Sequence, residues 1–276
     1  MNEFFDLIAQ CLREERPVAI ATVIETVDAP ASGPSAPPSL GAAILVSPER
    51  GNHGSFGNEP LDQVVTQDTN AALAAGQGLT RHYGLAGEPG LRDVTVFIDV
   101  FAPPPRLIVI GAVDYTRALV RVAKLLGYRV TVCDARPMFA TTKRFPEADD
   151  VVLSTPSEYV ATVAALLGPL DAICVLTHDH TYDVPAIKAA LDTKVGYLGA
   201  MGSRNTHEQR LQLLIDAGVD SARLHEIMAP IGINIGARTP EETAIAICAE
   251  IIARRANVEV HSLRDQTGPI HKVRST

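Results

Sequence analysis

Two patterns of hydrophobic and polar residues follow one another along the chain. Up to residue 101, short β-branched runs alternate with amphipathic stretches and with segments rich in glycine and proline. From residue 107 on, helical segments alternate with continuous apolar runs of the kind that buried parallel strands require. The change predicts an α/β protein, with a small N-terminal α+β domain over 1–101 and a Rossmann-like, doubly wound parallel sheet over 107–256.

The N-terminal pattern predicts two helices and three strands. One helix is expected before Pro17, which ends it, and another over 61–75. Residues 28–39 and 47–60 are rich in proline or glycine and are expected to be loops. The β-branched or alternating runs predict strands over 18–27, 42–46 and 93–100.

Residues 102–106 mark the expected domain boundary as a proline-rich linker. Three consecutive prolines favour an extended polyproline form and cannot continue a central strand. Beyond them, apolar runs predict strands over 107–110, 129–133, 150–153, 172–176 and 195–199. Helices are expected over 115–126, 159–167, 184–192 and 204–217, and again behind Thr239. The polar tail 257–276 shows no regular pattern.

Two of these helix starts carry the same cap pattern. Thr155-Pro156-Ser157-Glu158 and Thr239-Pro240-Glu241-Glu242 each combine a threonine, a proline at the first helical position and a glutamate three residues after the threonine. Both are predicted to be capping boxes. Behind the second, one apolar stripe is formed by Ala244, Ile247, Cys248 and Ile251.

Composition limits the possible function classes. The 276 residues are 46% hydrophobic and 20% charged, as in ordinary globular proteins, and a net charge of -8 disfavours a nucleic-acid binder that relies on a basic face. No run of about 18 apolar residues predicts a membrane span, and the first 16 residues do not read as a signal peptide. We therefore expect a cytoplasmic protein with no nucleic-acid partner.

The four cysteines are scattered singly, which disfavours a disulfide framework and a cysteine-rich zinc site. Cys133 and Cys174 lie in strands that look buried, whereas Cys11 and Cys248 lie on apolar helix faces. Core packing is the expected role of all four.

The clearest candidate site is a strand–glycine–helix–strand–acid unit that begins at residue 107. Asp134 follows Gly111 at roughly the 20-residue spacing of the acid that binds a ribose hydroxyl. The glycine pattern is incomplete, because Val113 and Thr116 stand where GxGxxG has its second and third glycines. The unit is either a nucleotide or pterin-dinucleotide crevice or a Rossmann scaffold that no longer binds NAD(P) tightly. The candidate cofactor-binding residues are Gly111, Ala112, Asp134 and Arg136.

Two further groups of polar residues follow predicted strands. One group, which could line the crevice, bind a metal or cap the next helix, is His178, Asp179, His180 and Asp183. Its spacing is poor for zinc, so no metal site is predicted. The other is either an anion site or a plain helix start and consists of Gly202, Ser203 and Arg204. Segment 230–236 either contacts a cofactor through its backbone or makes a tight crossover in the core.

Five segments in the second half carry a family resemblance. They are RFPEADDVV at 144–152, THDHTYD at 177–183, YLGAMGSRNTHEQRL at 197–211, APIGINIGARTPEETAIAICAEIIARR at 229–255 and SLRDQTGPIH at 262–271. In these segments the chain resembles the XdhC/CoxI family, whose members are accessory proteins of molybdenum hydroxylases such as xanthine dehydrogenase. In the N-terminal half, GAAILV and HGSFGNEPLD resemble the family's small domain more faintly.

The resemblance implies a cofactor-handling chaperone rather than a turnover enzyme. It would bind molybdenum cofactor, as molybdopterin or its dinucleotide, and protect it during sulfuration. The implied partners are the apo-form of a molybdenum hydroxylase, to which it hands the cofactor, and proteins of cofactor biosynthesis or sulfuration. A homodimer is a fair default for such an architecture.

The chain departs from this family at both sites that carry chemistry. The family's cofactor motif is Gly-Gly-Cys followed by a hydrophobic residue and Glu. The aligned residues 58–62 have lost both glycines, and Pro60 stands in place of the cysteine. The family often has Gly-x-Gly-His at the Rossmann turn, where this chain has Gly111-Ala112-Val113-Asp114.

Three functions are therefore open. The leading hypothesis is an accessory protein that binds molybdenum cofactor for a xanthine dehydrogenase or CO dehydrogenase type of enzyme. The second, from the strand–glycine–helix–strand–acid unit, is an NAD(P)-binding oxidoreductase. The third, from Pro60 and Val113, is a partner-binding protein without a bound small molecule.

Overall fold

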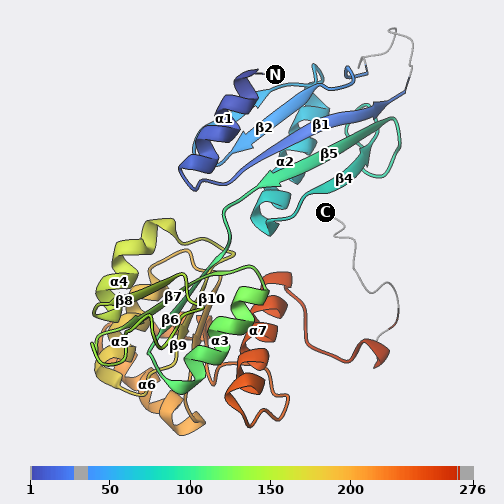
Figure 1. Cartoon of the computed structure of the whole chain (residues 1–276). Coiled ribbons are helices and arrows are strands. Elements are labelled where there is room, and N and C mark those ends of the chain that lie inside the picture. Colours follow the sequence, from blue (N-terminus) through green and yellow to red (C-terminus); the bar gives the residue numbers. More distant parts are fainter. Residues whose placement is uncertain (1, 28–36, 266, 268–276) are drawn as a thin grey trace. The chain divides into compact units, whose positions relative to one another are not determined.

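The computed structural model describes residues 2–27, 37–265 and 267. By its contacts the chain divides into two compact units, one up to Pro104 and one from Pro105 on, and the break falls inside the predicted linker 102–106. Each unit contains its own sheet (Figure 1). Most of the predicted loop 28–39 and the last part of the polar tail lie outside the described residues.

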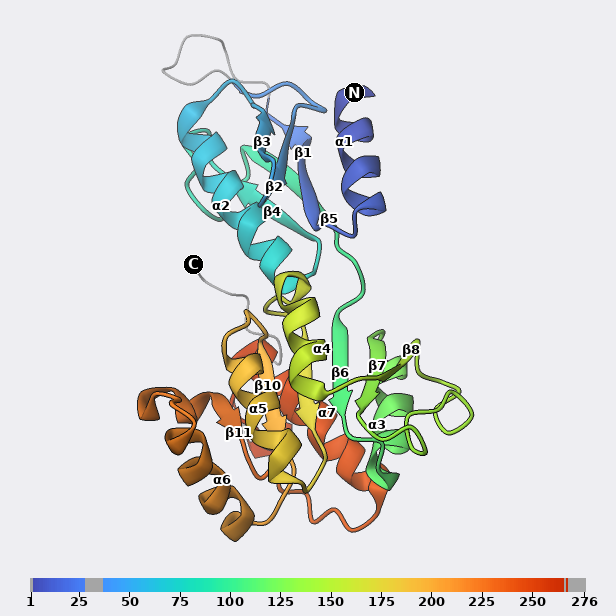
Figure 2. The ribbon, with the colours of Figure 1, turned by 90° about the vertical axis from the view of Figure 1, so that its left-hand side faces the viewer.

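The N-terminal unit is an antiparallel sheet with a helix on each face. Its strands are β1 (Val18–Thr26), β2 (Ala43–Ser47), β3 (Gly51–Gly54), β4 (Leu79–Tyr83) and β5 (Val94–Phe101), in the order β3-β2-β1-β5-β4. Helices α1 (Asn2–Arg13) and α2 (Glu59–Ala75) lie on opposite faces (Figure 2). Leu45 of β2 packs with Cys11 of α1, and its neighbour Ile44 packs with Leu61 of α2. Strand alternation therefore explains the α+β arrangement predicted for this unit.

The two edge strands of this sheet escape the sequence pattern. Strand β3 lies inside 47–60, so the prediction of a loop over that whole range is wrong. Its sequence, Gly-Asn-His-Gly, contains no apolar residue. In β4 only the two ends, Leu79 and Tyr83, reach the core. An edge strand pairs on one side only, and here its backbone hydrogen bonds define it without a hydrophobic alternation.

The C-terminal unit is the predicted doubly wound parallel sheet. Its strands are β6 (Arg106–Ile110), β7 (Arg129–Asp134), β8 (Asp150–Leu153), β9 (Ala172–Val175), β10 (Tyr197–Ala200) and β11 (Ile227–Met228). The spatial order is β11-β10-β9-β6-β7-β8, which is the Rossmann order 3-2-1-4-5-6 read from the other edge. Strand β11 has only two residues and was too short to be predicted.

Helices cover both faces of the parallel sheet. They are α3 (Asp114–Leu125), α4 (Pro156–Val163), α5 (His180–Leu191), α6 (Arg204–Asp216) and α7 (Pro240–Ala256), with short 3-10 turns at Ala164–Leu166, Ser221–Glu226 and Leu263–Asp265. Leu107 and Val109 of β6 face the layer of α3 and α7, whereas Ile108 and Ile110 face the layer of α4 and α5 (Figures 1 and 2). Both faces are buried, which explains why the strands read as continuous apolar runs.

One predicted helix cap and one predicted helix start need correction. The capping box at Thr239 forms, with the Thr239 hydroxyl accepting from the Glu242 amide, but the Thr155 side chain makes no such bond at the start of α4. Helix α5 begins at His180, one turn before the predicted 184, because its polar first turn hides the helical pattern.

Among the described residues no helix combines the length and apolar character that a bilayer crossing requires.

Candidate functional site

All eight candidate site residues lie at the carboxyl edge of the parallel sheet. They sit on or directly after four neighbouring strands: Gly111 and Ala112 after β6, Asp134 and Arg136 at the end of β7, His178 after β9, and Gly202, Ser203 and Arg204 after β10. The strand order reverses between β6 and β9, and ligands of such sheets bind in the crevice outside this switch point.

Gly111 allows the loops after β6 and β9 to approach each other. Its φ is +106°, and a Cβ placed on it would lie 2.5 Å from Cγ2 and 3.0 Å from the backbone nitrogen of Thr177. No other residue fits this conformation and spacing without strain. The glycine that the fingerprint retains thus has a structural reason to be there, independent of any ligand.

The backbone amides of the Rossmann turn are already used within the protein. The Gly111 amide donates to the Cys133 carbonyl at 2.8 Å, and the Ala112 amide donates to Asp134 Oδ2 at 2.7 Å. Thr116 is completely buried, and its hydroxyl donates to the Gly111 carbonyl at 2.5 Å while accepting from the Val113 amide at 3.3 Å. The turn therefore offers a pyrophosphate none of these three donors.

The Asp134 carboxylate, like the turn amides, already has all its hydrogen-bond partners within the protein. Its carboxylate accepts from the Ala112 amide, from the Arg136 amide and Nε at 2.9 Å each, and from Arg136 Nη2 at 2.7 Å. Burial would raise the pKa of Asp134, but these hydrogen bonds outweigh burial and hold the pKa below its usual value. A carboxylate has about four acceptor positions, so a ribose diol finds none vacant in this arrangement.

A buried ion pair behind the crevice was not predicted. Arg210 of α6 and Asp183 of α5 are both fully buried, and Arg210 Nη2 donates to Asp183 Oδ2 at 3.0 Å and to the Met201 carbonyl at 2.8 Å. Asp183 also accepts from the Thr177 hydroxyl. The network joins the loops after β9 and β10. The sequence holds one weak signal that Arg210 is buried. Arg210 precedes the apolar Leu214 by four residues, so the two side chains lie on the same face of α6, and that face is the buried one.

The remaining polar candidates are accessible. His178 and Arg204 are exposed and hydrogen-bond to no described residue. Asp179 caps α5 by accepting from the Thr181 amide, and Ser203 caps α6 by accepting from the Thr206 amide at 3.1 Å. Within the described ranges no three His, Cys, Asp or Glu side chains gather as metal ligands.

Segment 230–236 begins as a core crossover. The Gly232 amide donates to Glu250 Oε2 at 2.8 Å, and the Ile233 amide donates to the Ala246 carbonyl at 3.2 Å. Glu250 also accepts from the Tyr197 hydroxyl at 2.5 Å. These bonds fasten the first half of the segment to α7 and β10.

The residues aligned with the family's cofactor motif form a helix start in the N-terminal unit. Asn58 caps α2 by accepting from the Leu61 amide at 3.3 Å, and its Nδ2 donates to the Leu85 carbonyl at 2.6 Å. Pro60 lies in the first turn, where the backbone nitrogen needs no helical partner.

All four cysteines are buried, as expected for core residues. Burial raises the pKa of Cys133 and of Cys248 to about 12, and it also raises that of Cys174. A thiol with such a pKa stays protonated at neutral pH and is a poor metal ligand.

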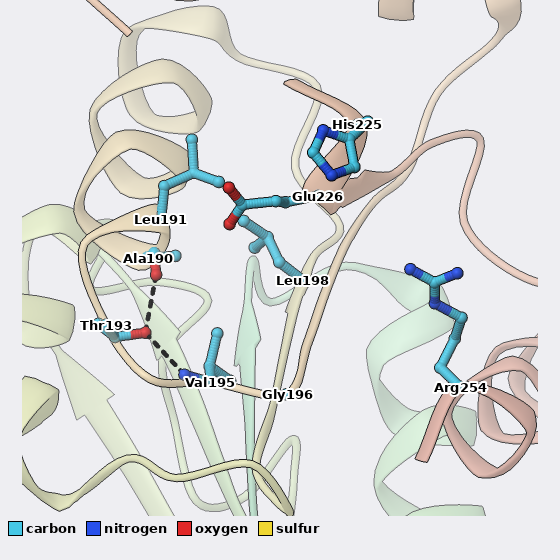
Figure 3. Close-up of a pocket in the computed structure, with 9 residues that line it drawn as sticks. All are labelled: Ala190, Leu191, Thr193, Val195, Gly196, Leu198, His225, Glu226 and Arg254. Atoms are coloured by element: carbon cyan, nitrogen blue, oxygen red, sulfur yellow. Dashed lines mark hydrogen bonds between the residues drawn. The ribbon is translucent and has the colours of Figure 1, made fainter. Parts of the chain in front are cut away.

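One polar pocket of about 190 Å³ lies at the opposite, amino edge of the sheet (Figure 3). It is bordered by the turn from α5 to β10, by the residues before β11, and by Arg254 near the end of α7. Thr193 closes the turn by donating to the Ala190 carbonyl at 2.7 Å. None of the candidate residues reaches this pocket.

Comparison with known proteins extends over most of the chain. A profile described as the XdhC Rossmann domain matches residues 107–251, and one described as the XdhC and CoxI family matches residues 11–84. A probable xanthine dehydrogenase subunit of Bacillus subtilis is 33% identical over 77% of this chain and 57% of its own length. A "molybdenum cofactor insertion chaperone PaoD" of Escherichia coli is 29% identical over 61% of this chain and 45% of its own length.

Among solved structures, one described as a xanthine dehydrogenase from Bacillus halodurans matches with a TM-score of 0.51 at 18% identity, over 92% of this chain and 96% of that one. This likeness concerns the fold. The chain spans about half the length of the curated relatives it matches. On the two profile matches together, the chain belongs to the XdhC and CoxI family.

Proposed function

We propose that this chain is an accessory protein for the maturation of a molybdenum hydroxylase, and that it binds the molybdenum cofactor and delivers it to the apo-enzyme. The observation that carries the proposal is the family match over residues 107–251, which includes the whole carboxyl edge described above. The names of two relatives, a cofactor insertion chaperone and a probable xanthine dehydrogenase subunit, support the same role.

The residues present fit an anionic pterin ligand better than a directly ligated metal ion. Pro60 supplies no sulfur, all four cysteines are buried, and burial raises the pKa of Cys133, Cys174 and Cys248. At the carboxyl edge, by contrast, Arg204 and His178 have free donors for polar or anionic groups, and Gly202 allows a close backbone approach. When bound, the cofactor supplies the redox-active molybdenum that the hydroxylase uses. This chain's residues would bind, orient and shield it.

The test is to purify the host's hydroxylase from cells with and without this chain and to measure its molybdenum content and activity. Loss of the chain is expected to lower both. Arg204→Gln should reproduce part of the loss, whereas Arg255→Gln, at an exposed arginine of the last turn of α7, serves as the matched control. Unchanged molybdenum loading in cells without the chain would overturn the proposal.

The oxidoreductase hypothesis is favoured by the strand order alone. Against it stand the turn amides and the Asp134 carboxylate, which are already hydrogen-bonded within the protein. We therefore expect NADH titrations followed by fluorescence to show no saturable binding in the micromolar range.

The third hypothesis, a partner-binding protein without a ligand, predicts that native mass spectrometry of the purified chain finds a partner and no small molecule.

A further inference from the structure

The loop between β7 and β8 carries two arginines stacked on one aromatic ring. The guanidinium carbons of Arg136 and Arg144 lie 4.4 Å and 5.0 Å from the centroid of the Phe139 ring. Arg144 also lies 5.5 Å from the centroid of buried Phe145. Stacking on aromatic faces fixes the planes of both guanidinium groups, and their N–H groups, which lie in those planes, can still form hydrogen bonds. We call these two side chains the guanidinium pair.

The two arginines differ in their partners: a carboxylate holds Arg136 in place, whereas the positive charge of Arg144 has no acidic partner among the described residues. Asp134 binds Nε and Nη2 of Arg136, and the Arg136 side chain is still 46% exposed. Arg144 forms no ion pair with any residue in the described ranges, and its Nη1 is buried without a hydrogen-bond partner there. A buried guanidinium N–H without an acceptor is costly, which points to a missing anionic partner.

The guanidinium pair belongs to the candidate crevice. It follows β7, where Rossmann sheets recognise the substituent on the ribose, and an arginine here accommodates a phosphate in place of a hydroxyl. The hydrogen bond to Asp134 raises the pKa of Arg136, and the Asp179 carboxylate adds to that rise, so the loop after β9 lies within electrostatic reach.

We infer that the guanidinium pair binds a phosphomonoester dianion of the crevice's ligand, and that Asp134 is a positioning residue which orients Arg136. The inference rests on the proposed function in taking this edge as the ligand site. The saturated carboxylate cannot also bind a free ribose diol, so the pair selects a ligand that carries a phosphate at this position. The phosphate could be the terminal group of a pterin cofactor or the 2′-phosphate of an adenine dinucleotide.

The full chain is titrated calorimetrically with inorganic phosphate. Arg136→Gln and Arg144→Gln should each weaken phosphate binding by about tenfold or more, since each removes a charge-assisted hydrogen-bond donor. The matched control is Arg13→Gln, which removes the same charge from an exposed position in the N-terminal unit. Arg144→Lys, which keeps the charge but loses the planar stack, should bind phosphate at an intermediate affinity.

Titration with NADP+ and NAD+ distinguishes the two sources of the phosphate. Tighter binding of NADP+ than of NAD+ identifies a nucleotide 2′-phosphate, whereas phosphate binding without such a preference excludes that source and leaves the pterin phosphate. Absence of phosphate binding at millimolar concentration, or equal binding by Arg13→Gln and the two loop variants, overturns the inference. Because these titrations need no hydroxylase, the maturation assay can fail while the phosphate site is still found.

Discussion

At Gly111 a single residue decides how closely two loops of the sheet approach. A side chain there meets two obstacles, the positive φ and the Thr177 backbone and methyl group. Gly127, elsewhere in the same unit, also has a positive φ, of +81°, but a Cβ added to it would meet nothing within 4 Å. A substitution at Gly127 therefore tests the backbone strain without the steric clash.

We expect Gly111→Ala to lower the free energy of unfolding by about 2–5 kcal/mol, the sum of backbone strain and overpacking. Gly127→Ala should cost only the backbone strain, about 1–2 kcal/mol. Urea denaturation of the three proteins measures both values. Equal losses of unfolding free energy in the two variants would contradict the prediction, because they would show that Thr177 moves aside at no energetic cost.

The buried pair of Arg210 and Asp183 is the second feature decided by individual residues. Arg210→Met leaves the Asp183 carboxylate buried without its cation and is expected to cost about 3–5 kcal/mol of unfolding free energy. Adding Asp183→Asn removes the stranded charge, so the double variant should be more stable than Arg210→Met alone. If the double variant is less stable instead, the Thr177 and Met201 contacts matter more than the charge balance. Denaturant titration of both variants decides this.

At the scale of elements, similar local sequences lead to different structures. The two Thr-Pro-x-Glu segments both begin helices, but only in α7 does the threonine hydroxyl accept from the third helical amide. The sequence predicted both helix starts correctly and one of the two caps wrongly. Whether a cap forms depends on the backbone angles with which the preceding loop arrives, and tertiary contacts set those angles.

Thr239→Ala should therefore lower the unfolding free energy by about 1 kcal/mol through loss of the cap. Thr155→Ala is the matched control, because its exposed side chain makes no capping bond, and its effect should stay below about 0.5 kcal/mol. Thermal unfolding followed by circular dichroism compares the pair. A larger loss from Thr155→Ala than from Thr239→Ala would contradict the capping geometry.

For the whole molecule, the proline-rich linker separates two units with their own cores. Leu61 is fully buried in the N-terminal core and Leu119 in the C-terminal core, and no core cluster of the described residues contains members of both units. Such units are expected to unfold as separate cooperative transitions.

Scanning calorimetry should resolve two transitions in the full chain. Leu61→Ala should destabilise only one of them and Leu119→Ala only the other, each by about 2–5 kcal/mol, the usual cost of truncating a leucine in a core. If either variant shifts both transitions equally, the two units unfold together and the prediction fails.

The sequence by itself determined the fold class, because buried parallel strands and amphipathic helices leave hydrophobic patterns along the chain. The family followed from a different signal, the resemblance of five segments between residues 144 and 271. The sequence also placed every candidate residue on one edge of the sheet, since that position follows from the strand each residue ends. Edge strands β3 and β4 escaped because one-sided pairing leaves little hydrophobic pattern.

Only the tertiary structure decided which candidates are free to bind a ligand. Asp134 reads in the sequence as a ribose acceptor, but in the fold Arg136 and the Ala112 amide fill its oxygens. The sequence analysis did not single out Arg210, and in the fold it is buried against Asp183. Hydrogen bonding and burial depend on groups brought together from distant strands, and the local pattern of one segment carries no record of them.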